Sequence, residues 1–132
     1  MECYSSLLNL GVLDPEGMHR ADYDSTFACK NVAIRGKGTI ASGGRVLAER
    51  IIASETENLK DYLVSLGDKI KECEKPETIP ARVRPRLINM SNCQNVELAG
   101  VTLRDGACWN IHMIYCDHVV THGCTFYSHG IW

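Results

Sequence analysis

Three polar residues, Asn89, Asn110 and His112, have side chains suited to binding hydroxyl and carboxylate groups. An amide donates and accepts hydrogen bonds, and a neutral imidazole carries one donor and one acceptor. Asn89 and His112 are 23 residues apart, and each follows an isoleucine. These residues can act together only if the fold places them on one surface.

A second group of possible ligands is His118 and His122, with Cys116 and Cys124 on either side. On a helix, a spacing of four would place both histidines on one face. The alternating pattern around them predicts a strand instead, on which they lie about 13 Å apart, too far to share a zinc ion. We therefore expect no metal and no cofactor.

A 23-residue repeat is the main pattern in the chain. Residues 92–103 and 115–126 share Cys, Val, Gly and Thr at this constant offset, and residues 28–36 open in the same way. Apolar residues alternate within each copy, as in short strands, and Gly100 supplies the freedom for a bend. This period, with no helix between the strands, predicts coils of a parallel β-helix. Cys29, Cys93 and Cys116 are expected to stack inside it as a core ladder.

The repeat predicts which residues share a face. Equivalent positions in stacked strands lie about 4.8 Å apart, so Asn89 and His112 should form one outward column. Asn110 and Leu87, two residues back, should form the neighbouring column on the same face. The isoleucines between the two columns should point into the core.

Three arginines, Arg82, Arg84 and Arg86, form the basic cluster nearest to this sheet. They either attract an anionic ligand or remain solvated and cap the chain. Trp109 and Trp132 are also 23 residues apart, which favours stacked packing at a corner, with stacking on a sugar as the alternative.

Residues 41–80 interrupt the repeat. Apolar residues from Leu59 to Cys73 recur at helical spacing, and Ser54 with Glu57 has the pattern of a capping box that would begin this helix. A shorter helix is predicted over residues 46–52, and Gly67 is expected to split or bend the longer one. We expect a helical insertion packed on the strands of a single domain, 1–132, or one that shapes one end of a binding cleft.

Composition limits the class of protein. The chain has 132 residues, 45% apolar residues and a formal net charge of −2, which suits one domain and argues against a nucleic-acid partner. No apolar run approaches the roughly 20 residues of a membrane span, and the first residues do not resemble a signal peptide. The odd number of cysteines, without a C-x-x-C pair, favours free thiols. The expected location is therefore cytoplasmic or undetermined.

Several segments occur in an order that suggests a family. They are Cys3–Leu8, Asn31–Ile40, Arg84–Asn89, Asn92–Val96, Gly100–Leu103 and Trp109–His112. Together they resemble the polygalacturonases of glycoside hydrolase family 28. The resemblance implies an all-β fold, a right-handed parallel β-helix of which this chain is one part. It also implies hydrolysis of α-1,4-galacturonosyl bonds in pectin or oligogalacturonides, with inversion and without a metal.

The catalytic acids of that family lie in an Asn-x-Asp-Gly motif and in an Asp-Asp pair one coil later, and neither occurs here. Residues 127–132 resemble the lead-in to the first motif. Its aspartate would fall three residues beyond Trp132, directly above His112 by the repeat. We therefore expect an N-terminal portion of such an enzyme, without catalytic residues, that binds substrate through Asn89, Asn110 and His112.

Inverting hydrolysis needs two carboxyl groups about 6.5–9.5 Å apart. Glu97, Asp105 and Asp117 are expected to lie away from the cleft sheet and to be solvated. The alternatives are a pectate-lyase-like enzyme, which would need clustered calcium ligands, and a non-catalytic carbohydrate-binding or structural β-helix. An uncapped last coil would also leave strand edges open, so self-association through the C-terminal coil is expected.

Overall fold

The computed structural model describes residues 6–12, 27–67 and 78–128. These residues form nine strands in three successive passes, with three helices between the first pass and the second. The first pass comprises β1 (Leu8–Gly11), β2 (Cys29–Arg35) and β3 (Thr39–Ala41). The second comprises β4 (Ile88–Ser91), β5 (Cys93–Ala99) and β6 (Thr102–Arg104). The third comprises β7 (Ile111–Ile114), β8 (Asp117–His122) and β9 (Thr125–Tyr127).

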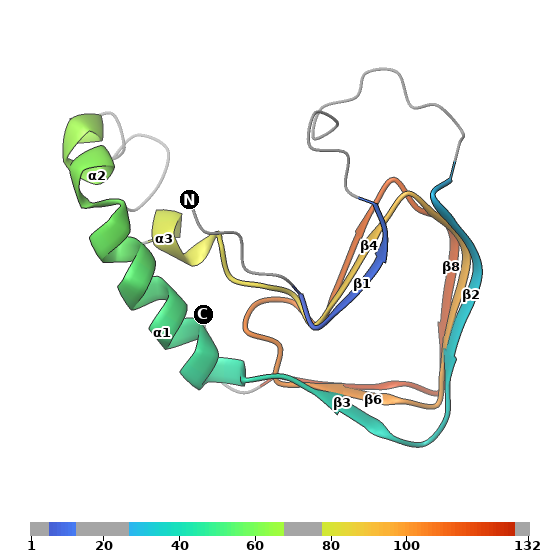
Figure 1. The fold of residues 1–132 in the computed structure, drawn as a ribbon. Helices are drawn as coiled ribbons and strands as arrows, with labels where there is room; N and C mark the ends of the chain where they lie inside the picture. Colours follow the sequence, from blue (N-terminus) through green and yellow to red (C-terminus); the bar gives the residue numbers. More distant parts are fainter. Residues whose placement is uncertain (1–5, 13–26, 68–77, 129–132) are drawn as a thin grey trace.

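Corresponding strands of the three passes pair in parallel. They form three sheets, ordered β1-β4-β7, β2-β5-β8 and β3-β6-β9. Figure 1 shows these sheets as three sides around a common interior. The 23-residue repeat is confirmed, because Ile88 pairs with Ile111 and Thr102 with Thr125. Parallel strands in this order are compatible with a parallel β-helix.

The interior is apolar and is most tightly closed around the second pass. The core side chains of this pass are at most 4% exposed, and they are Leu87, Ile88, Met90, Cys93, Val96, Leu98, Val101 and Leu103. Partly buried side chains of the first and third passes pack against this cluster on either side. The middle pass is therefore the core of the strand region, because among the described strands only those of the second pass pair on both sides.

The predicted cysteine ladder is confirmed. Cys29 pairs with Cys93, and Cys116 packs in the same core cluster. Cys93 is fully buried, and burial, followed by the neighbouring thiols Cys116 and Cys29, raises its pKa to about 12. A neutral thiol in this place behaves as a small apolar side chain.

A left-handed residue in each pass sets which side chains face inward. Asn31, Asn95 and His118 have φ of 58°, 56° and 54°, and each follows the ladder cysteine by two positions. In a regular strand, residues three apart point to opposite faces. The left-handed residue resets this alternation, so that Cys93 and Val96 both face the core. Asn and His are among the residues that tolerate this conformation best, which explains their recurrence at this position.

Gly100 makes the next bend, as predicted. Its φ is +74°, and a Cβ at this position would lie 2.5 Å from the carbonyl oxygen of Gly36 in the neighbouring pass. A side chain would therefore meet the backbone that stacks on it. Glycine satisfies both the conformation and the spacing.

Three helices make the chain a mixed structure, so the fold is not all-β. They are α1 (Gly44–Asn58), α2 (Lys60–Leu66) and α3 (Thr78–Ala81). The amide of Gly44 donates to the carbonyl oxygen of Asp105, 2.9 Å away, and this attaches the start of α1 to the end of β6. In Figure 1, α1 and α2 extend away from the sheets, and α3 lies beside α1.

The helical insertion is confirmed, but its predicted subdivision is wrong. Helix α1 is continuous across Ser54 and Glu57, so these residues do not form a capping box. The break falls at Leu59, and Gly67, with φ of 51°, ends α2. Buried positions Ala48, Ile51 and Glu55 continue one stripe along α1, and this shared packing keeps α1 continuous past Ser54. The last part of the predicted helix, up to Cys73, lies outside the described residues.

Position 95 should be sensitive to side-chain shape. We expect Asn95→Val to destabilise the fold by about 1–3 kcal/mol, because a β-branched residue is strained at positive φ and because the 3.0 Å hydrogen bond from Asn95 to Asn31 is lost. Ala33→Val places the same side chain at an exposed position of β2 with ordinary φ, and it should change stability by less than about 0.5 kcal/mol. Urea unfolding measures both. Equal effects of the two substitutions would contradict the role of the left-handed residue.

Candidate functional site

The outer face of the β1-β4-β7 sheet carries the predicted polar column. Asn89 pairs with His112 across β4 and β7, as the repeat predicted. The column also includes Asn9 of β1, which pairs with Asn89. The repeat offset did not reveal Asn9, because 80 residues, which include the insertion, separate it from Asn89. The row therefore crosses all three passes.

Asn89 and His112 interact directly. Nδ1 of His112 lies 2.7 Å from Oδ1 of Asn89. A carbonyl oxygen only accepts, so Nδ1 carries the proton and Nε2 of the neutral ring is an acceptor. Partial burial and, to a lesser extent, the charge of Arg86 lower the pKa of His112, which favours this neutral form. The pair thus presents an amide group and an imidazole acceptor beside each other.

An exposed tryptophan and an arginine flank this pair. Trp109 is 56% exposed, and its ring centroid lies 5.4 Å from that of His112. The guanidinium carbon of Arg86 lies 5.5 Å from the centroid of the Trp109 ring. We call Arg86, Asn89, Trp109 and His112 the outer-face cluster. Sequence reasoning named each residue but did not predict the packing that joins them.

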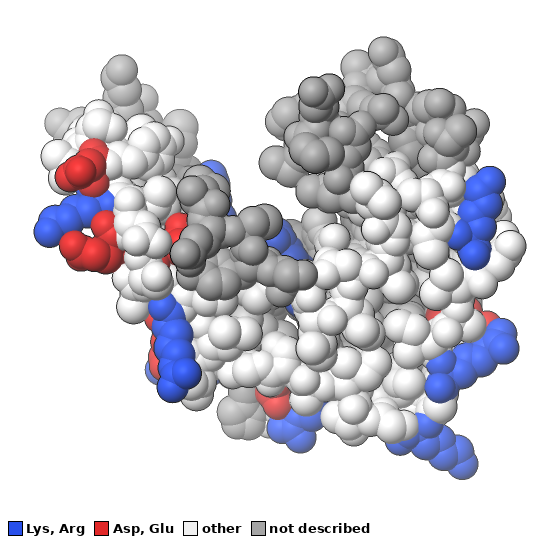
Figure 2. All heavy atoms as spheres, in the orientation of Figure 1, with Lys and Arg blue, Asp and Glu red and all other residues white. Residues whose placement is uncertain are grey.

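The cluster faces the side of the molecule where the helices stand away from the sheets. The segment that joins α3 to β4, which contains Arg86, and the loop that joins β6 to β7, which contains Trp109, both run on this side in Figure 1. Figure 2 shows a hollow there between the helical part and the strand part, with Lys and Arg atoms inside it. A basic, partly aromatic surface of this kind suits an anionic ligand with an apolar face.

Asn110 lies near the cluster, but its amide is engaged within the chain. Its Oδ1 accepts from the amide of Gly106 at 3.2 Å. Its Nδ2 lies 3.3 Å from both the carbonyl oxygen of Tyr127 and Oγ of Ser128. These bonds hold the β6–β7 loop against the end of β9. Asn110 therefore positions the loop that carries Trp109, and its predicted contact with substrate stays a prediction.

The prediction that Leu87 lies in an outward column is wrong. Leu87 is fully buried and belongs to the core cluster. Strand β4 begins at Ile88, so the alternation used to place Leu87 does not extend to it. The remaining arginines differ in role. The Nε of Arg84 donates to the carbonyl oxygen of Ala81 at 2.7 Å, which is a capping contact. Trp132, the second predicted tryptophan, lies outside the described residues.

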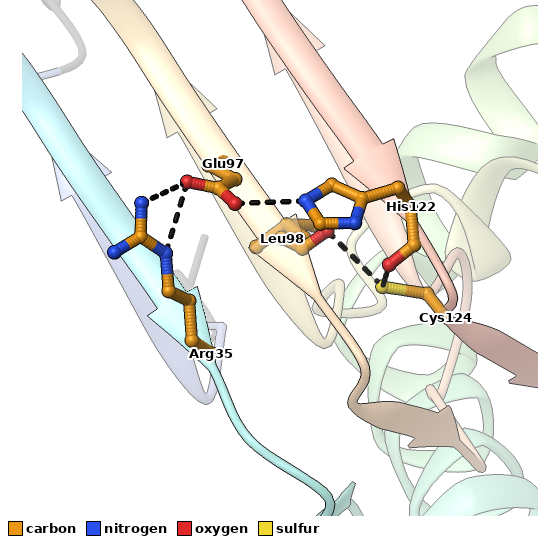
Figure 3. Close-up of polar contacts among 5 residues, drawn as sticks. All are labelled: Arg35, Glu97, Leu98, His122 and Cys124. Atoms are coloured by element: carbon orange, nitrogen blue, oxygen red, sulfur yellow. Dashed lines mark hydrogen bonds and ion pairs between the residues drawn. The ribbon is translucent and has the colours of Figure 1, made fainter.

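The second sheet carries a separate group of charges on its outer face. Arg35, Glu97 and His122 come from β2, β5 and β8, and they form a continuous row in Figure 3. Nε of Arg35 donates to Oε2 of Glu97 at 3.0 Å, and Nε2 of His122 lies 2.8 Å from Oε1. Hydrogen bonds from Arg35, and then from His122, lower the pKa of Glu97 to about 2. Glu97 is therefore not simply a solvent-exposed carboxylate, because its side chain links strands β2, β5 and β8.

The other candidate acids and ligands have partners outside the outer-face cluster. Asp117 belongs to β8 of the second sheet and interacts with Gln94 and His118. Asp105 follows β6 and accepts from Arg104 at 2.6 Å. His118 and His122 face different carboxylates, Asp117 and Glu97. Among the described residues, no three of His, Cys, Asp and Glu are grouped so as to hold a metal ion.

The helices enclose a cleft of about 800 Å³. It is lined by Glu55, Asn58, Leu59, Tyr62, Ile79, Arg82 and Val83. Glu55 is fully buried at its side; its Oε1 accepts from Asn58 at 3.1 Å. None of the three predicted binding residues lines this cleft. Whether the insertion shapes one end of a substrate cleft stays a prediction.

Comparison with protein-family models, with curated proteins and with solved structures gives no significant match to this chain. In the described part of the chain, no helix combines the length and the apolar character needed to cross a membrane. Function is therefore inferred from the residues and from the geometry of the outer-face cluster.

The Arg35–Glu97–His122 row should make stability depend on pH. The pKa of Glu97 is lowered from about 4.5 to about 2 in the folded chain, so its stabilising contribution is complete above about pH 4.5 and is lost as the pH falls towards 2. We expect Glu97→Gln to be less stable than the parent chain at pH 7 and to approach it in stability near pH 2. Urea unfolding across this range is the measurement.

The matched control for this prediction is Glu49→Gln. Glu49 pairs with Arg45 at 2.6 Å on the exposed side of α1, where an ion pair contributes about 0.3–0.5 kcal/mol. Its substitution should have a smaller effect. A difference between Glu97→Gln and the parent chain that stays constant from pH 7 to pH 2 would contradict the role assigned to the row.

Proposed function

We propose that this chain forms part of a right-handed parallel β-helix of the polygalacturonase type and binds pectin or oligogalacturonides on its β1-β4-β7 face. Support for the fold comes from three in-register parallel passes around one apolar interior. Nearly all connections between parallel strands of one sheet are right-handed, which favours that hand here. Five described cysteines are free thiols, in keeping with a reducing, cytoplasmic compartment.

The outer-face cluster is the observation that carries the proposed function. A galacturonate unit has a carboxylate, several hydroxyls and an apolar ring face. Arg86 offers a cation for the carboxylate, and Trp109 offers an exposed ring for the apolar face. Asn89 and neutral His112 offer donors and an acceptor for hydroxyls. The row from Asn9 to His112 runs across the strands, so a linear polymer can lie along it.

Hydrolysis by inversion would need two carboxyl groups on this face. The described carboxylates that follow the insertion are Glu97, Asp105 and Asp117, and they belong to the other two sheets or follow them. In the proposed enzyme, acids outside this sequence supply the chemistry, and the cluster holds and orients the polymer beside them. The 132-residue chain itself binds without cleaving.

A non-catalytic carbohydrate-binding β-helix is the second candidate. It is favoured by the same observation, because the outer-face cluster contains a cation, two neutral polar groups and an aromatic ring but no acid. Incubation of polygalacturonate with a longer chain that includes the residues after Trp132 separates the two candidates. Release of reducing ends supports the hydrolase, and binding without release supports the carbohydrate-binding role.

Trigalacturonate binding, measured by isothermal titration calorimetry, tests the proposed function. Trp109→Ala and Arg86→Gln should each weaken binding by about 5- to 30-fold, since loss of a stacked ring or of a charge-assisted bond removes about 1–2 kcal/mol. Glu97→Gln, which changes a residue on the second sheet, is the control and should leave affinity unchanged. Arg86→Gln should also reduce the salt dependence, because one ion pair is lost.

A neutral trisaccharide of galactose is the matched ligand. It keeps the hydroxyls and the ring face but lacks the carboxylates, so the parent chain should bind it more weakly than trigalacturonate. The parent chain and Arg86→Gln should bind this neutral trisaccharide with about the same affinity. The proposal fails if the parent chain does not bind trigalacturonate, or if Glu97→Gln weakens binding as much as Trp109→Ala does.

A further inference from the structure

The third pass leaves core positions uncovered. Met113 and Phe126 are 51% and 49% exposed, although their partners in the second pass, Met90 and Leu103, are fully buried. Val120, on the outer face of β8, is 55% exposed. In the described part of the chain, β7, β8 and β9 each pair on one side only. Exposed apolar side chains next to unpaired strand edges mark a surface for further strand pairing.

The first pass has a matching open edge. Leu8, Leu10, Ile34 and Ile40 are only partly buried, whereas their partners Ile88, Met90, Leu98 and Leu103 are fully buried. Strands β1, β2 and β3 also pair on one side only within the described residues. Among the described residues, the strand region therefore has two open ends with the same cross-section, because one register runs through all three passes.

We propose that the third pass of one copy of this chain docks against the first pass of a second copy, and that the parallel register of the sheets continues across the junction. Such a junction adds three parallel strand pairs at once. It buries apolar side chains of both ends in one continuous interior. The inference rests on the strand pairing and not on the proposed pectin binding, and it concerns the chain of 132 residues by itself; in a longer enzyme, further strands would occupy the place of the second copy.

Side chains at the two ends are complementary in this register. The passes align Ile111 with Leu8, Met113 with Leu10, Val119 with Val32 and Phe126 with Ile40, so an apolar residue meets an apolar residue at four inward positions. On the outer face, large Val120 meets small Ala33 of the second copy. The first pass of one copy thus offers apolar partners for the partly exposed apolar side chains of the third pass of another copy.

Charge complementarity favours a second copy over an unrelated apolar partner. Lys30, Gln94 and Asp117 occupy equivalent positions in the three passes. At the junction, Asp117 of one copy therefore lies opposite Lys30 of the next, and opposite charges on neighbouring strands attract. Within its own chain, Asp117 accepts from Gln94 at 3.1 Å, and Lys30 lies over the ring of Phe27. Both charges lie at the strand edges that the junction joins.

Because the contact joins two different surfaces, it does not close into a dimer. Each added copy leaves one open end of either kind, so the chain is expected to form linear head-to-tail assemblies. Their average length should increase with protein concentration.

Cross-linking between two single variants, Ala33→Cys and Val120→Cys, tests the geometry of the junction. Within one chain these positions flank Glu97 of β5 and lie about two strand spacings, or roughly 9.6 Å, apart, which is too far for a disulfide. Across the junction they would lie about 4.8 Å apart. Mild oxidation of the mixed variants, followed by peptide mass spectrometry, should yield a disulfide that joins position 33 of one copy to position 120 of another.

Each variant oxidised alone is the control, and neither should yield a disulfide between two copies of its own introduced cysteine. A link between position 120 of one copy and position 120 of another would mean that two third passes meet, and it would overturn the proposal. Capture of the thiol introduced at position 120 by a residue other than 33, or a parent chain that remains a monomer at every concentration by analytical ultracentrifugation, would overturn it as well.

Substitutions that exchange the charges at positions 117 and 30 test the same junction without introduced cysteines. Asp117→Lys should weaken self-association by about 2- to 5-fold, since like charges then face each other across the junction. The double variant Asp117→Lys with Lys30→Asp restores opposite charges and should recover the association of the parent chain. Circular dichroism confirms that each variant is folded, and failure of the double variant to recover association, with the fold intact, would contradict the proposed register.

Discussion

The in-register pairing of three parallel passes is the constraint on which the rest of this structure depends. Parallel strands stacked without a shift place identical positions of each pass one above another. The left-handed residues Asn31, Asn95 and His118 repeat the same change of face in every pass. Equivalent positions therefore have the same role, in the core, at a corner or on an outer face, in every pass. A shift of one residue in any strand would turn its apolar side chains outward.

The same register gives two outer faces different character. On the β2-β5-β8 face, Glu97 is satisfied by Arg35 and His122, so these groups hold strands together. On the β1-β4-β7 face, the row contains Asn9, Asn89 and His112 without a carboxylate, and Arg86 lies over an exposed tryptophan. One face uses its charges to connect strands, while the other leaves a cation and an aromatic ring beside polar groups. This difference, more than any single residue, is the reason for proposing the ligand site on the first sheet.

Much of the strand region could be predicted, because a repeat in sequence becomes a repeat in space. The alignment of Asn89 with His112 and the cysteine ladder followed from the offset alone. Leu87 was misplaced because alternation applies only inside a strand. The helix break was placed at Ser54 instead of Leu59, because local capping chemistry does not reveal the continuous buried stripe of α1. Asn9 was missed as a partner because the insertion separates it from the other passes. The Arg35–Glu97 pair was missed because it joins positions that are not equivalent in the register, in which Arg35 pairs with Ala99. Side-chain packing such as Arg86 on Trp109 leaves no periodic signal.

The most direct test of the account is a crystal structure of the chain with bound trigalacturonate, because it shows the ligand and the sheet register together. The account predicts sugar density along the row from Asn9 to His112, with a ring against Trp109 and a carboxylate near Arg86. Density on the β2-β5-β8 face or in the cleft among the helices would contradict it.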